Sequence, residues 1–353
     1  MAGISIALAT HNGEEYLAAQ LASLAAQTRL PAELVISDDR SLDRTLEIAT
    51  EFAARAPFPV RIMQGEERVG FRDNFLRAAK TCDAELIAFC DQDDIWEPEK
   101  LAVMERVFDD PQVLLAYHNA TLISAKGGAV GQVYSGDAGV EIFPPLTRHP
   151  WLVVPGFMQV FRRDLMRFLP LQSDSYDADW PGEPLAHDRW FFFLASVFGK
   201  IAFVRQPLVR YRQHRGNVYG YYPDKRAHFD RLVRGENFLL ESATAAGNRS
   251  ELLRRMQFDF MPQWRVGALQ GATYYDALRR RLESRAAVYA APSYLARVKA
   301  FYALVRSGAY GKARGTASFN WVDLLIDANL AVPLGPRLRR LSRRQPRQHS
   351  RKN

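Results

Sequence analysis

An α/β fold with a mostly parallel sheet, covered by helices on both faces, is predicted for the N-terminal part of this 353-residue chain. Short β-rich runs alternate with helical patterns through residues 1–110, and this rhythm is typical of such a sheet. The composition, 48% hydrophobic and 24% charged, is that of a globular protein and excludes disorder of the whole chain. A helical, Arg-rich region is expected to follow over residues 221–332.

The individual elements follow from hydrophobic periodicity. Strands are expected at residues 4–9, 34–37, 60–63, 86–90 and 113–124, with helical segments between the first four and another over residues 98–108. One helix should begin after Ser41 as its N-cap and present Leu42, Leu46 and Ala49 on one face. Residues 125–150, which contain Gly and Pro, are expected to form a loop region.

The charge of the chain is concentrated at its C-terminal end. Residues 332–353 contain eight Lys and Arg and no acid, which equals the net charge of +8, so residues 1–331 are neutral. A neutral body without a known nucleic-acid-binding motif argues against nucleic acid as a partner. We expect residues 333–353 to be a disordered basic tail that binds an anionic membrane surface; a solvated end without a role is the alternative.

Two cysteines, Cys82 and Cys90, support neither a disulfide framework nor a cysteine-based zinc site. The N-terminus lacks a basic region and an apolar run long enough for a signal peptide, and the longest apolar stretch, residues 190–204, is interrupted by Gly199 and Lys200. We therefore expect a cytoplasmic protein, with peripheral attachment to the inner face of the cell membrane as a further expectation.

Acidic side chains follow two of the predicted strands. Asp91, Asp93 and Asp94 come directly after residues 86–90, where three adjacent carboxylates need a cation or a proton to neutralise them. Mg²⁺ or Mn²⁺ is the natural partner, because carboxylates and substrate phosphates together complete its coordination. The alternative is a solvated turn in which Asp94 caps the next helix.

Asp38 and Asp39 end a neighbouring strand, and ligands of open α/β sheets bind at the carboxyl ends of strands. Asp39 could accept hydrogen bonds from a nucleobase or a ribose, while a turn or cap is the alternative for Asp38. His11 and Asn12 follow the first strand, where Asn-Gly suits a turn with positive φ and His11 could stack on a base. The glycine motifs of dinucleotide-binding oxidoreductases, P-loop NTPases and common serine hydrolases are absent from the sequence.

Two further positions are chemically suggestive. Asp188 precedes an apolar helix and is either its N-cap or, if it faces a cleft, a base for an acceptor hydroxyl. His214 ends another predicted strand and could complete the coordination of a metal.

Several collinear segments together resemble a known family. They read ISIALATHNGEEYLAAQLASLAAQT, LVISDDRSLDRTLEIA, VGFRDNF, LIAFCDQDDIWEPEKL, PGFMQVFRRDL, AHDRWFFFLASVFGKI and PLVRYRQHRGNVYG. Over residues 3–220 the chain resembles family 2 glycosyltransferases with the GT-A fold, and most of all their bacterial rhamnosyltransferase-like branch. The usual Gly after the acidic pair is replaced by Arg40.

The resemblance implies a role for each matching residue. Asp188 is expected to be the catalytic base, and Asp93, Asp94 and His214 to hold Mn²⁺ or Mg²⁺. Gly156, His187 and Trp190 are expected on the acceptor side. The donor-binding residues are expected to be Thr10, His11, Asn12, Glu15, Asp38, Asp39, Arg72, Asn74, Asp91, Gln92 and Asp93.

The resemblance also implies a domain organisation. Residues 1–220 are expected to form the catalytic domain, with a nucleotide-sugar-binding half at 1–110 and an acceptor-side half at 111–220. The helical region is expected at 221–332, where Tyr294, Leu295, Phe301 and Tyr302 fall mostly on one helical side. That side is either a membrane-surface face or packs against the catalytic domain.

The expected activity is an inverting, metal-dependent transfer of a sugar from a nucleoside diphosphate to a hydroxyl of a cell-surface glycan precursor. The donor is expected to be dTDP-rhamnose, with UDP-sugars open, and the acceptor a glycan or a polyprenyl-linked saccharide. A metal-dependent sugar nucleotidyltransferase, and an inactive glycan- or membrane-binding protein on the same scaffold, are the alternatives.

Overall fold

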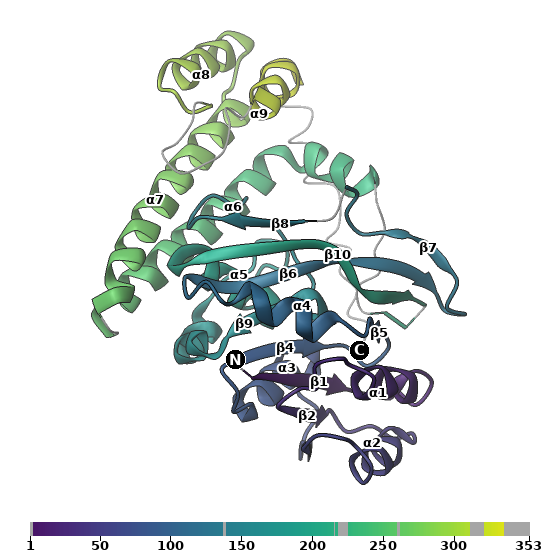
Figure 1. The fold of residues 1–353 in the computed structure, drawn as a ribbon. Coiled ribbons are helices and arrows are strands. Elements are labelled where there is room, and N and C mark those ends of the chain that lie inside the picture. Colours follow the sequence, from purple (N-terminus) through teal and green to yellow (C-terminus); the bar gives the residue numbers. More distant parts are fainter. Residues whose placement is uncertain are drawn as a thin grey trace. The chain divides into compact units, whose positions relative to one another are not determined.

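The computed structural model describes residues 3–136, 139–214, 216–217, 225–259, 262–310 and 321–334 (Figure 1). The chain divides into two compact units. The first comprises residues 1–145, 150–172 and 185–221, and the second comprises residues 146–149, 173–184 and 222–353. The second unit therefore takes two short segments from within the expected catalytic domain in addition to the C-terminal region.

The first unit is built on one mixed sheet with the strand order β3-β2-β1-β4-β9-β6-β10-β5, while β7 pairs with β6 and β8 with β10. Its strands are β1 (Ile4–Thr10), β2 (Glu33–Asp38), β3 (Val60–Gln64), β4 (Leu86–Cys90), β5 (Ile95–Trp96), β6 (Val113–Ser124), β7 (Ala129–Gln132), β8 (Val140–Phe143), β9 (Gln159–Arg162) and β10 (Lys200–Gln213).

The parallel part of this sheet confirms the predicted α/β class. Strands β3, β2, β1 and β4 are parallel neighbours, and β10 is parallel to β6. Every residue of β1, β2 and β4 is buried, because helices cover this part of the sheet on both sides. The register pairs Thr10 with Asp38 and Leu8 with Cys90, so the carboxyl ends of these three strands share one edge.

Helices connect the strands of the first unit. They are α1 (Leu17–Ala25), α2 (Thr45–Ala53), α3 (Gly70–Thr81), α4 (Lys100–Val107) and α5 (His187–Phe198), with 3₁₀ segments η1 (Gly156–Met158) and η2 (Arg163–Asp174). Helix α3 packs on β1, β2 and β4 and contacts α5, which packs on β6 and β10. Helices α1 and α2 contact each other and cover the opposite face, as right-handed crossovers require when the chain reverses direction after β3.

Two local predictions were wrong. Residues 125–150 are not only loop, because β7 and β8 lie there; both are short and lie off the main path of the sheet, which explains their weak pattern. Ser41 is not the N-cap of α2, since the helix begins at Thr45 and Leu42 is 92% exposed. Asp43 accepts from the backbone N–H of Thr45 instead, and this hydrogen bond helps to lower the pKa of Asp43.

The second unit is helical, as predicted. It contains α6 (Lys225–Asp259, kinked at Gly235), α7 (Pro262–Ala290), α8 (Tyr294–Arg306), α9 (Trp321–Ile326) and the π-helical η3 (Asp327–Ala331). Helices α6 and α7 pack along each other. Within the ranges given above, the helices include none that is both long and apolar enough to cross a bilayer. The basic tail is expected at residues 333–353; its first two residues, Pro333 and Leu334, are helical, and the rest lies outside the described residues.

Candidate active site

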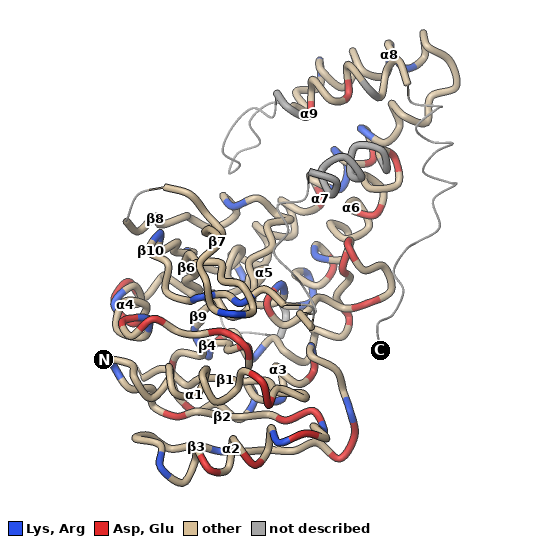
Figure 2. Tube along the Cα trace, turned by 90° about the vertical axis from the view of Figure 1, so that its right-hand side faces the viewer, with Lys and Arg blue, Asp and Glu red and all other residues tan. Residues whose placement is uncertain are grey.

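The carboxyl ends of β1, β2 and β4 bring the predicted donor-binding residues to one edge of the sheet. Acidic segments run along the loops that follow these strands (Figure 2). Asp91, Asp93 and Asp94 follow β4, and their ligand atoms all lie within 4.8 Å of one another. The sequence places these carboxylates next to one another, and the fold keeps them together.

This acidic cluster, defined as Asp91, Asp93 and Asp94, is electrostatically strained. Burial, followed by the charges of Asp93 and Asp188, raises the pKa of Asp91 to about 8. Burial and the two neighbouring carboxylates also raise the pKa of Asp94 well above its usual range. Asp94 accepts from the backbone N–H of Arg212 at Oδ1, and its buried Oδ2 has no hydrogen-bond partner among the described residues. Asp94 is therefore not the helix cap that was the alternative.

These residues fit a divalent cation. Three carboxylates converge, one of them presents an unpartnered buried oxygen, and hard oxygen ligands are those that Mg²⁺ and Mn²⁺ prefer. A cation would offset both the cost of burying these charges and their mutual repulsion, the two causes that raise the pKa values of Asp91 and Asp94. The acidic cluster is thus a chemically suitable metal site.

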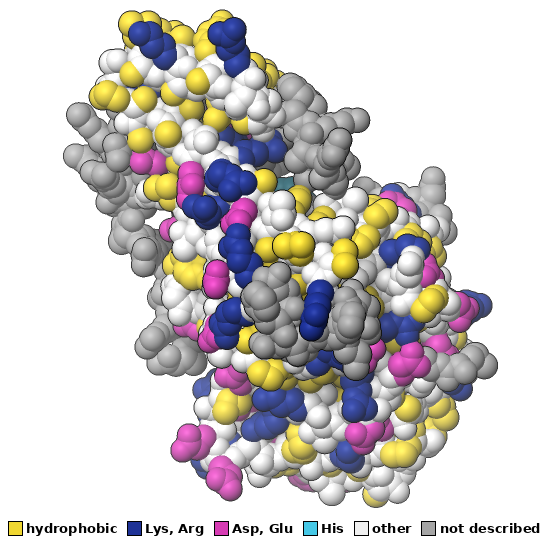
Figure 3. All heavy atoms as spheres, turned by 90° about the vertical axis from the view of Figure 1, so that its left-hand side faces the viewer, with side chains coloured by type: hydrophobic (Ala, Val, Ile, Leu, Met, Phe, Trp, Pro, Cys, Tyr) yellow, Lys and Arg dark blue, Asp and Glu magenta, His cyan; other side chains and the backbone are white. Residues whose placement is uncertain are grey.

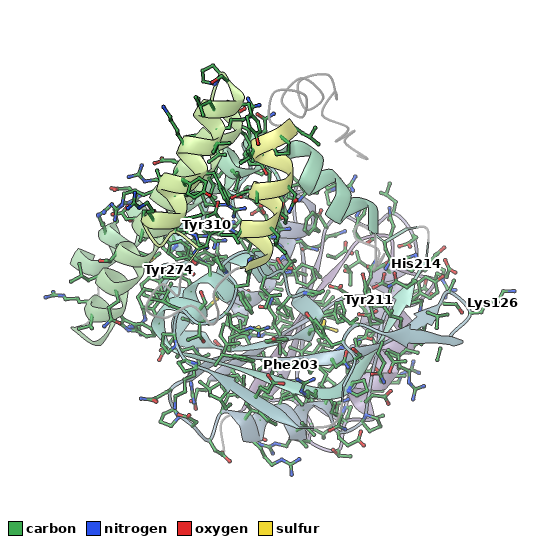
Figure 4. All side chains as sticks on the ribbon, turned by 90° about the horizontal axis from the view of Figure 1, so that it is seen from above. Lys126, Phe203, Tyr211, His214, Tyr274 and Tyr310 are labelled. Carbon is green, nitrogen blue, oxygen red and sulfur yellow. The ribbon has the colours of Figure 1, made fainter. Side chains whose placement is uncertain are left out.

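Residues at and just after the end of β10, among them His214 (labelled in Figure 4), hold the acidic cluster in place. Arg212 donates from Nε to the carbonyl oxygen of Asp93, in addition to its backbone bond to Asp94. His214 lies 2.7 Å from Asp93 Oδ2 through Nε2, while its Nδ1 accepts from the backbone N–H of Gly216. Because Nδ1 accepts, Nε2 carries the proton and donates to Asp93. In this tautomer His214 orients Asp93, and direct ligation through Nε2 would require loss of that proton.

A buried lysine, Lys100, lies beneath the acidic cluster. Lys100 is 0% exposed. Its Nζ donates to the carbonyl oxygen of Phe157 at 2.8 Å and lies 3.3 Å from the centre of the Trp96 ring. Burial lowers the pKa of Lys100 to about 7, against the opposing influence of Cys90, Asp94 and Asp91. Lys100 therefore connects the acidic cluster to η1, which carries Gly156.

Asp38 and Asp39 both have structural partners. Asp38 accepts from Thr10 Oγ1, Ser41 Oγ and the backbone N–H of Ser41, which is the turn role considered as its alternative. Asp39 is 2% exposed and accepts from the backbone N–H groups of Val69 and Gly70, at 2.8 Å each. Arg40 adopts a positive φ of 61°, a conformation that the usual Gly would adopt without strain.

The loop after β1 is held by the side chain of Gln92. Gln92 accepts from the backbone N–H of His11 and donates to its carbonyl oxygen. A Cβ at Gly13 would lie 2.3 Å from Gln92 Oε1, so this approach requires glycine. Asn12, rather than Gly13, takes the positive φ of this turn at 46°. Glu15 is exposed, and its hydrogen bond with Tyr16 raises the pKa of that tyrosine.

Side chains of helix α3 hold the carboxyl ends of β1 and β2 in place. Asn74 donates to the carbonyl oxygen of Thr10 and accepts from Arg77 Nη2, which also donates to the carbonyl oxygen of Asp38. Asn74 is 2% exposed, so its role in this structure is to position the ends of β1 and β2. Arg72 lies with Cζ 5.7 Å from the centre of the Phe71 ring, and its charge helps to lower the pKa of His187.

Asp188 lies in the first turn of α5, and Ala186, not Asp188, is the N-cap. Asp188 Oδ1 accepts from the backbone N–H of Arg189 at 2.7 Å, and its carbonyl oxygen accepts from Gln159 Nε2 at 3.3 Å. Its charge contributes to the raised pKa of Asp91. The structure thus brings the carboxylate expected to be the base close to the acidic cluster.

The other expected acceptor-side residues lie in the core. Trp190 is 0% exposed, and His187 is 5% exposed and stacks on Phe75 with ring centres 4.1 Å apart. Burial lowers the pKa of His187 to about 4, so this side chain is neutral at physiological pH. In this structure the rings of His187 and Trp190 therefore pack in the core, and their expected place on the acceptor side stays a prediction.

Gly156 lies against His187 and Asp188. A Cβ at Gly156 would lie 2.7 Å from His187 Nε2 and 3.6 Å from Asp188 Cβ. We expect Gly156→Ala to displace the His187 ring and, through it, the adjoining Asp188, and to lower kcat about tenfold or more, since misplacing a reacting group by 1 Å can cost about 100-fold. Gly131→Ala on the exposed strand β7 is the control, because its Cβ would meet only Leu122 Cδ1 at 3.8 Å. Equal kcat values for the two variants would show that Gly156 does not position Asp188.

Four positioning residues were not predicted: Arg77, Lys100, Gln159 and Arg212. Each acts through a backbone group that is distant in the sequence, so no local spacing marks it. Lys100 in particular looks like a surface lysine at a helix start, and only the tertiary fold buries it.

Comparison with known proteins agrees with this geometry. Residues 5–168 match the family model described as Glycosyl transferase family 2. The uncharacterized protein Rv1520 of Mycobacterium tuberculosis is 28% identical over 243 residues, which cover 68% of this chain and 67% of the relative. The dTDP-rhamnosyl transferase RfbG of Shigella flexneri is 28% identical over 233 residues, 64% of this chain and 78% of RfbG.

Among solved structures, S. aureus TarS residues 1–349 in complex with UDP-GlcNAc aligns over 90% of this chain and 97% of that chain, with 18% identity and a TM-score of 0.49.

The fold is α/β with an acidic cluster at the carboxyl ends of its parallel strands, and residues 5–168 match the family 2 glycosyltransferase model. Over residues 5–168 the chain is similar to the family 2 glycosyltransferases. This similarity favours a glycosyltransferase over a sugar nucleotidyltransferase.

Proposed function

We propose that this protein is an inverting glycosyltransferase that moves rhamnose from dTDP-rhamnose to a hydroxyl of a cell-surface glycan precursor. The observation that carries the proposal is the approach of Asp188 to the acidic cluster, since one carboxylate is needed on the acceptor side and a cation site on the diphosphate side. The choice of dTDP-rhamnose rests on the similarity to RfbG, and UDP-sugars are the competing donors.

On the acceptor side of the reaction, Asp188 would act as the catalytic base. Its Oδ1 is oriented by the backbone N–H of Arg189, and Gln159 fixes the backbone of the same residue. Asp188 Oδ2 would accept the proton of the acceptor hydroxyl as the hydroxyl oxygen attacks the anomeric carbon from the side opposite the diphosphate. Neutral His187 is buried behind it and does not compete for this proton.

The diphosphate side would be served by the acidic cluster. Asp93 and Asp94 would hold Mn²⁺ or Mg²⁺, with Asp91 adjacent and His214 orienting Asp93. A bound cation supplies Lewis-acid stabilisation of the negative charge that develops on the departing diphosphate.

The nucleotide would lie along the ends of β1 and β2. Thr10, His11, Asn12 and Asp39 border this region. His11 donates from Nδ1 to the carbonyl oxygen of Asp39, which fixes the orientation of its ring. Because the Asp39 carboxylate is covered by Val69 and Gly70, its contact with a nucleobase requires this segment to move aside.

A thermal-shift panel tests the donor. We expect dTDP-rhamnose with Mn²⁺ to raise Tm more than UDP-glucose, UDP-N-acetylglucosamine or GDP-mannose at the same concentration, because tighter binding to the folded state gives more stabilisation. A larger shift with a UDP-sugar would replace the proposed donor, and no shift with any nucleotide sugar would contradict the proposed function.

We also propose that the protein acts at the cytoplasmic side of the cell membrane on a glycan or a polyprenyl-linked saccharide. The eight basic residues of 332–353 support this, because a polybasic segment is attracted to anionic lipid headgroups by about 1 kcal/mol per Lys or Arg.

A further inference from the structure

Helix α8 of the second unit exposes an apolar face. Tyr294, Leu295 and Tyr302 are each more than 60% exposed, and Val305 is 40% exposed. At 3.6 residues per turn these four side chains fall within an arc of about 100°. Arg297 and Leu304, each 6% exposed, lie on the other side of the helix. Large apolar side chains gathered on one exposed helix face indicate a surface that contacts something other than water.

The opposite face of α8 is fixed inside the second unit. Arg297 donates to the carbonyl oxygens of Val332 at 2.6 Å and Ala291 at 3.3 Å. Just beyond α8, Tyr310 donates to Asp327 Oδ2 at 2.7 Å.

Asp327 is also held by a buried ion pair with Arg285 of α7 at 2.7 Å. Removing one partner of a buried ion pair costs about 3–5 kcal/mol. Helix α8 therefore cannot rotate to bury its apolar face without breaking the hydrogen bonds of Arg297 and the contacts of Asp327.

Basic side chains border the apolar face. Lys299 and Arg306 are exposed and lie next to the arc, on the side of Leu295. The sequence contains no Asp or Glu between Glu283 and Asp323, although it contains six Lys and Arg there. Figure 3 shows hydrophobic and basic side chains together in the upper part of the view, where Figure 1 places α8.

We propose that α8 binds an anionic lipid surface, with its apolar face in the interfacial region and Lys299 and Arg306 at the headgroups. The charge pattern selects this occupant, because lipid phosphates complement a basic border. A second copy of the chain on the same face would bring its own basic border and no acid. The helix has 13 residues, which suits an orientation in the plane of the interface. This inference is independent of the donor and of the catalytic base.

Vesicle co-sedimentation of the full-length chain tests it. We expect Leu295→Glu/Tyr302→Glu to lower the partition coefficient on phosphatidylcholine–phosphatidylglycerol vesicles at least tenfold. The matched control is Val266→Glu/Leu269→Glu on α7, where the side chains are 62% and 58% exposed and the charge change is identical. The control should bind vesicles as the wild type does, apart from a small general effect of charge. Circular dichroism and Tm establish that all variants are folded.

A second variant tests the basic border. Lys299→Ser/Arg306→Ser should weaken binding to the phosphatidylglycerol vesicles about tenfold or more and leave binding to pure phosphatidylcholine unchanged, with a smaller difference at high salt. Wild-type binding by Leu295→Glu/Tyr302→Glu, or an equal loss in the α7 control, would overturn the proposal. A lipid-free dimer that the α8 variant disperses would also overturn it, in favour of self-association. Donor-dependent thermal shifts, measured on the same samples, report separately on the proposed function.

Discussion

The Asp188→Asn variant is expected to lose sugar transfer by about 10²–10⁴-fold in kcat while it retains donor binding. Asparagine preserves the shape of the side chain but cannot accept the proton of the acceptor hydroxyl, and general-base catalysis contributes about this factor. The measurement is kcat with saturating donor, together with the Tm shift that the donor produces. Asp188 does not cap α5 with its side chain, so the fold should tolerate the change.

Asp73→Asn is the matched control for this variant. Asp73 is an exposed carboxylate in the first turn of α3, so the substitution makes the same chemical change at a comparable helix position in a residue outside the acidic cluster. Both variants lose a favourable charge near a helix N-terminus, worth about 0.3–1 kcal/mol. Only Asp188→Asn should lose activity; near wild-type kcat in that variant would show that another group is the base.

The Asp94→Asn variant is expected to have opposite effects on metal binding and on stability. Asparagine keeps the Oδ1 acceptor for the backbone N–H of Arg212 but removes one charge from the acidic cluster. Mn²⁺ affinity should fall at least about 100-fold, since even outer-shell changes cost 10–100-fold. The metal-free protein should gain stability at pH 8, because the repulsion and burial that raise the pKa of Asp94 are relieved. A metal titration and thermal unfolding measure the two effects.

The pH dependence has a defined sign. The pKa of Asp91 is about 8 in the folded protein against an ordinary value of 3.8, so the folded state holds the proton more tightly than the unfolded state. This group therefore lowers the free energy of unfolding as pH rises from about 4 to about 8. Protons compete with the cation, so the rise in Tm caused by Mn²⁺ should be larger at pH 8 than at pH 6. A Mn²⁺ effect that is equal at both pH values, or unchanged in Asp94→Asn, would contradict a metal site at the acidic cluster.

The parallel half of the sheet could be predicted from the sequence because its strands are short, uniformly apolar and separated by amphipathic helices. The acidic cluster could be predicted because Asp91, Asp93 and Asp94 are adjacent in the chain and follow a buried strand. Strands β7 and β8 could not, since β7 is a short, fully exposed strand that pairs with the preceding β6, and β8 pairs with β10, which is distant in the sequence.

The predicted site roles differ in how far the fold supports them. Asp188 reaches the acidic cluster only because the fold brings α5 next to η1 and β9. The spacing of residues in the sequence does not reveal this placement. His187 and Trp190 stand beside Asp188 in the sequence, yet helical geometry turns them into the core. Lys100 is the opposite case, a charged residue at a helix start that the sequence would place on the surface. It is fully buried because η1 packs against it.

We expect the edge formed by β1, β2 and β4 to bind a nucleoside diphosphate together with a divalent cation at the acidic cluster. Calorimetric titration of dTDP and of UDP into the wild-type protein, with Mn²⁺ and with EDTA, measures this most directly. We predict at least tenfold tighter binding of one of the two nucleotides with Mn²⁺, and loss of this difference in Asp94→Asn. Equal affinity with Mn²⁺ and with EDTA, or no binding of either nucleotide, would contradict the claim.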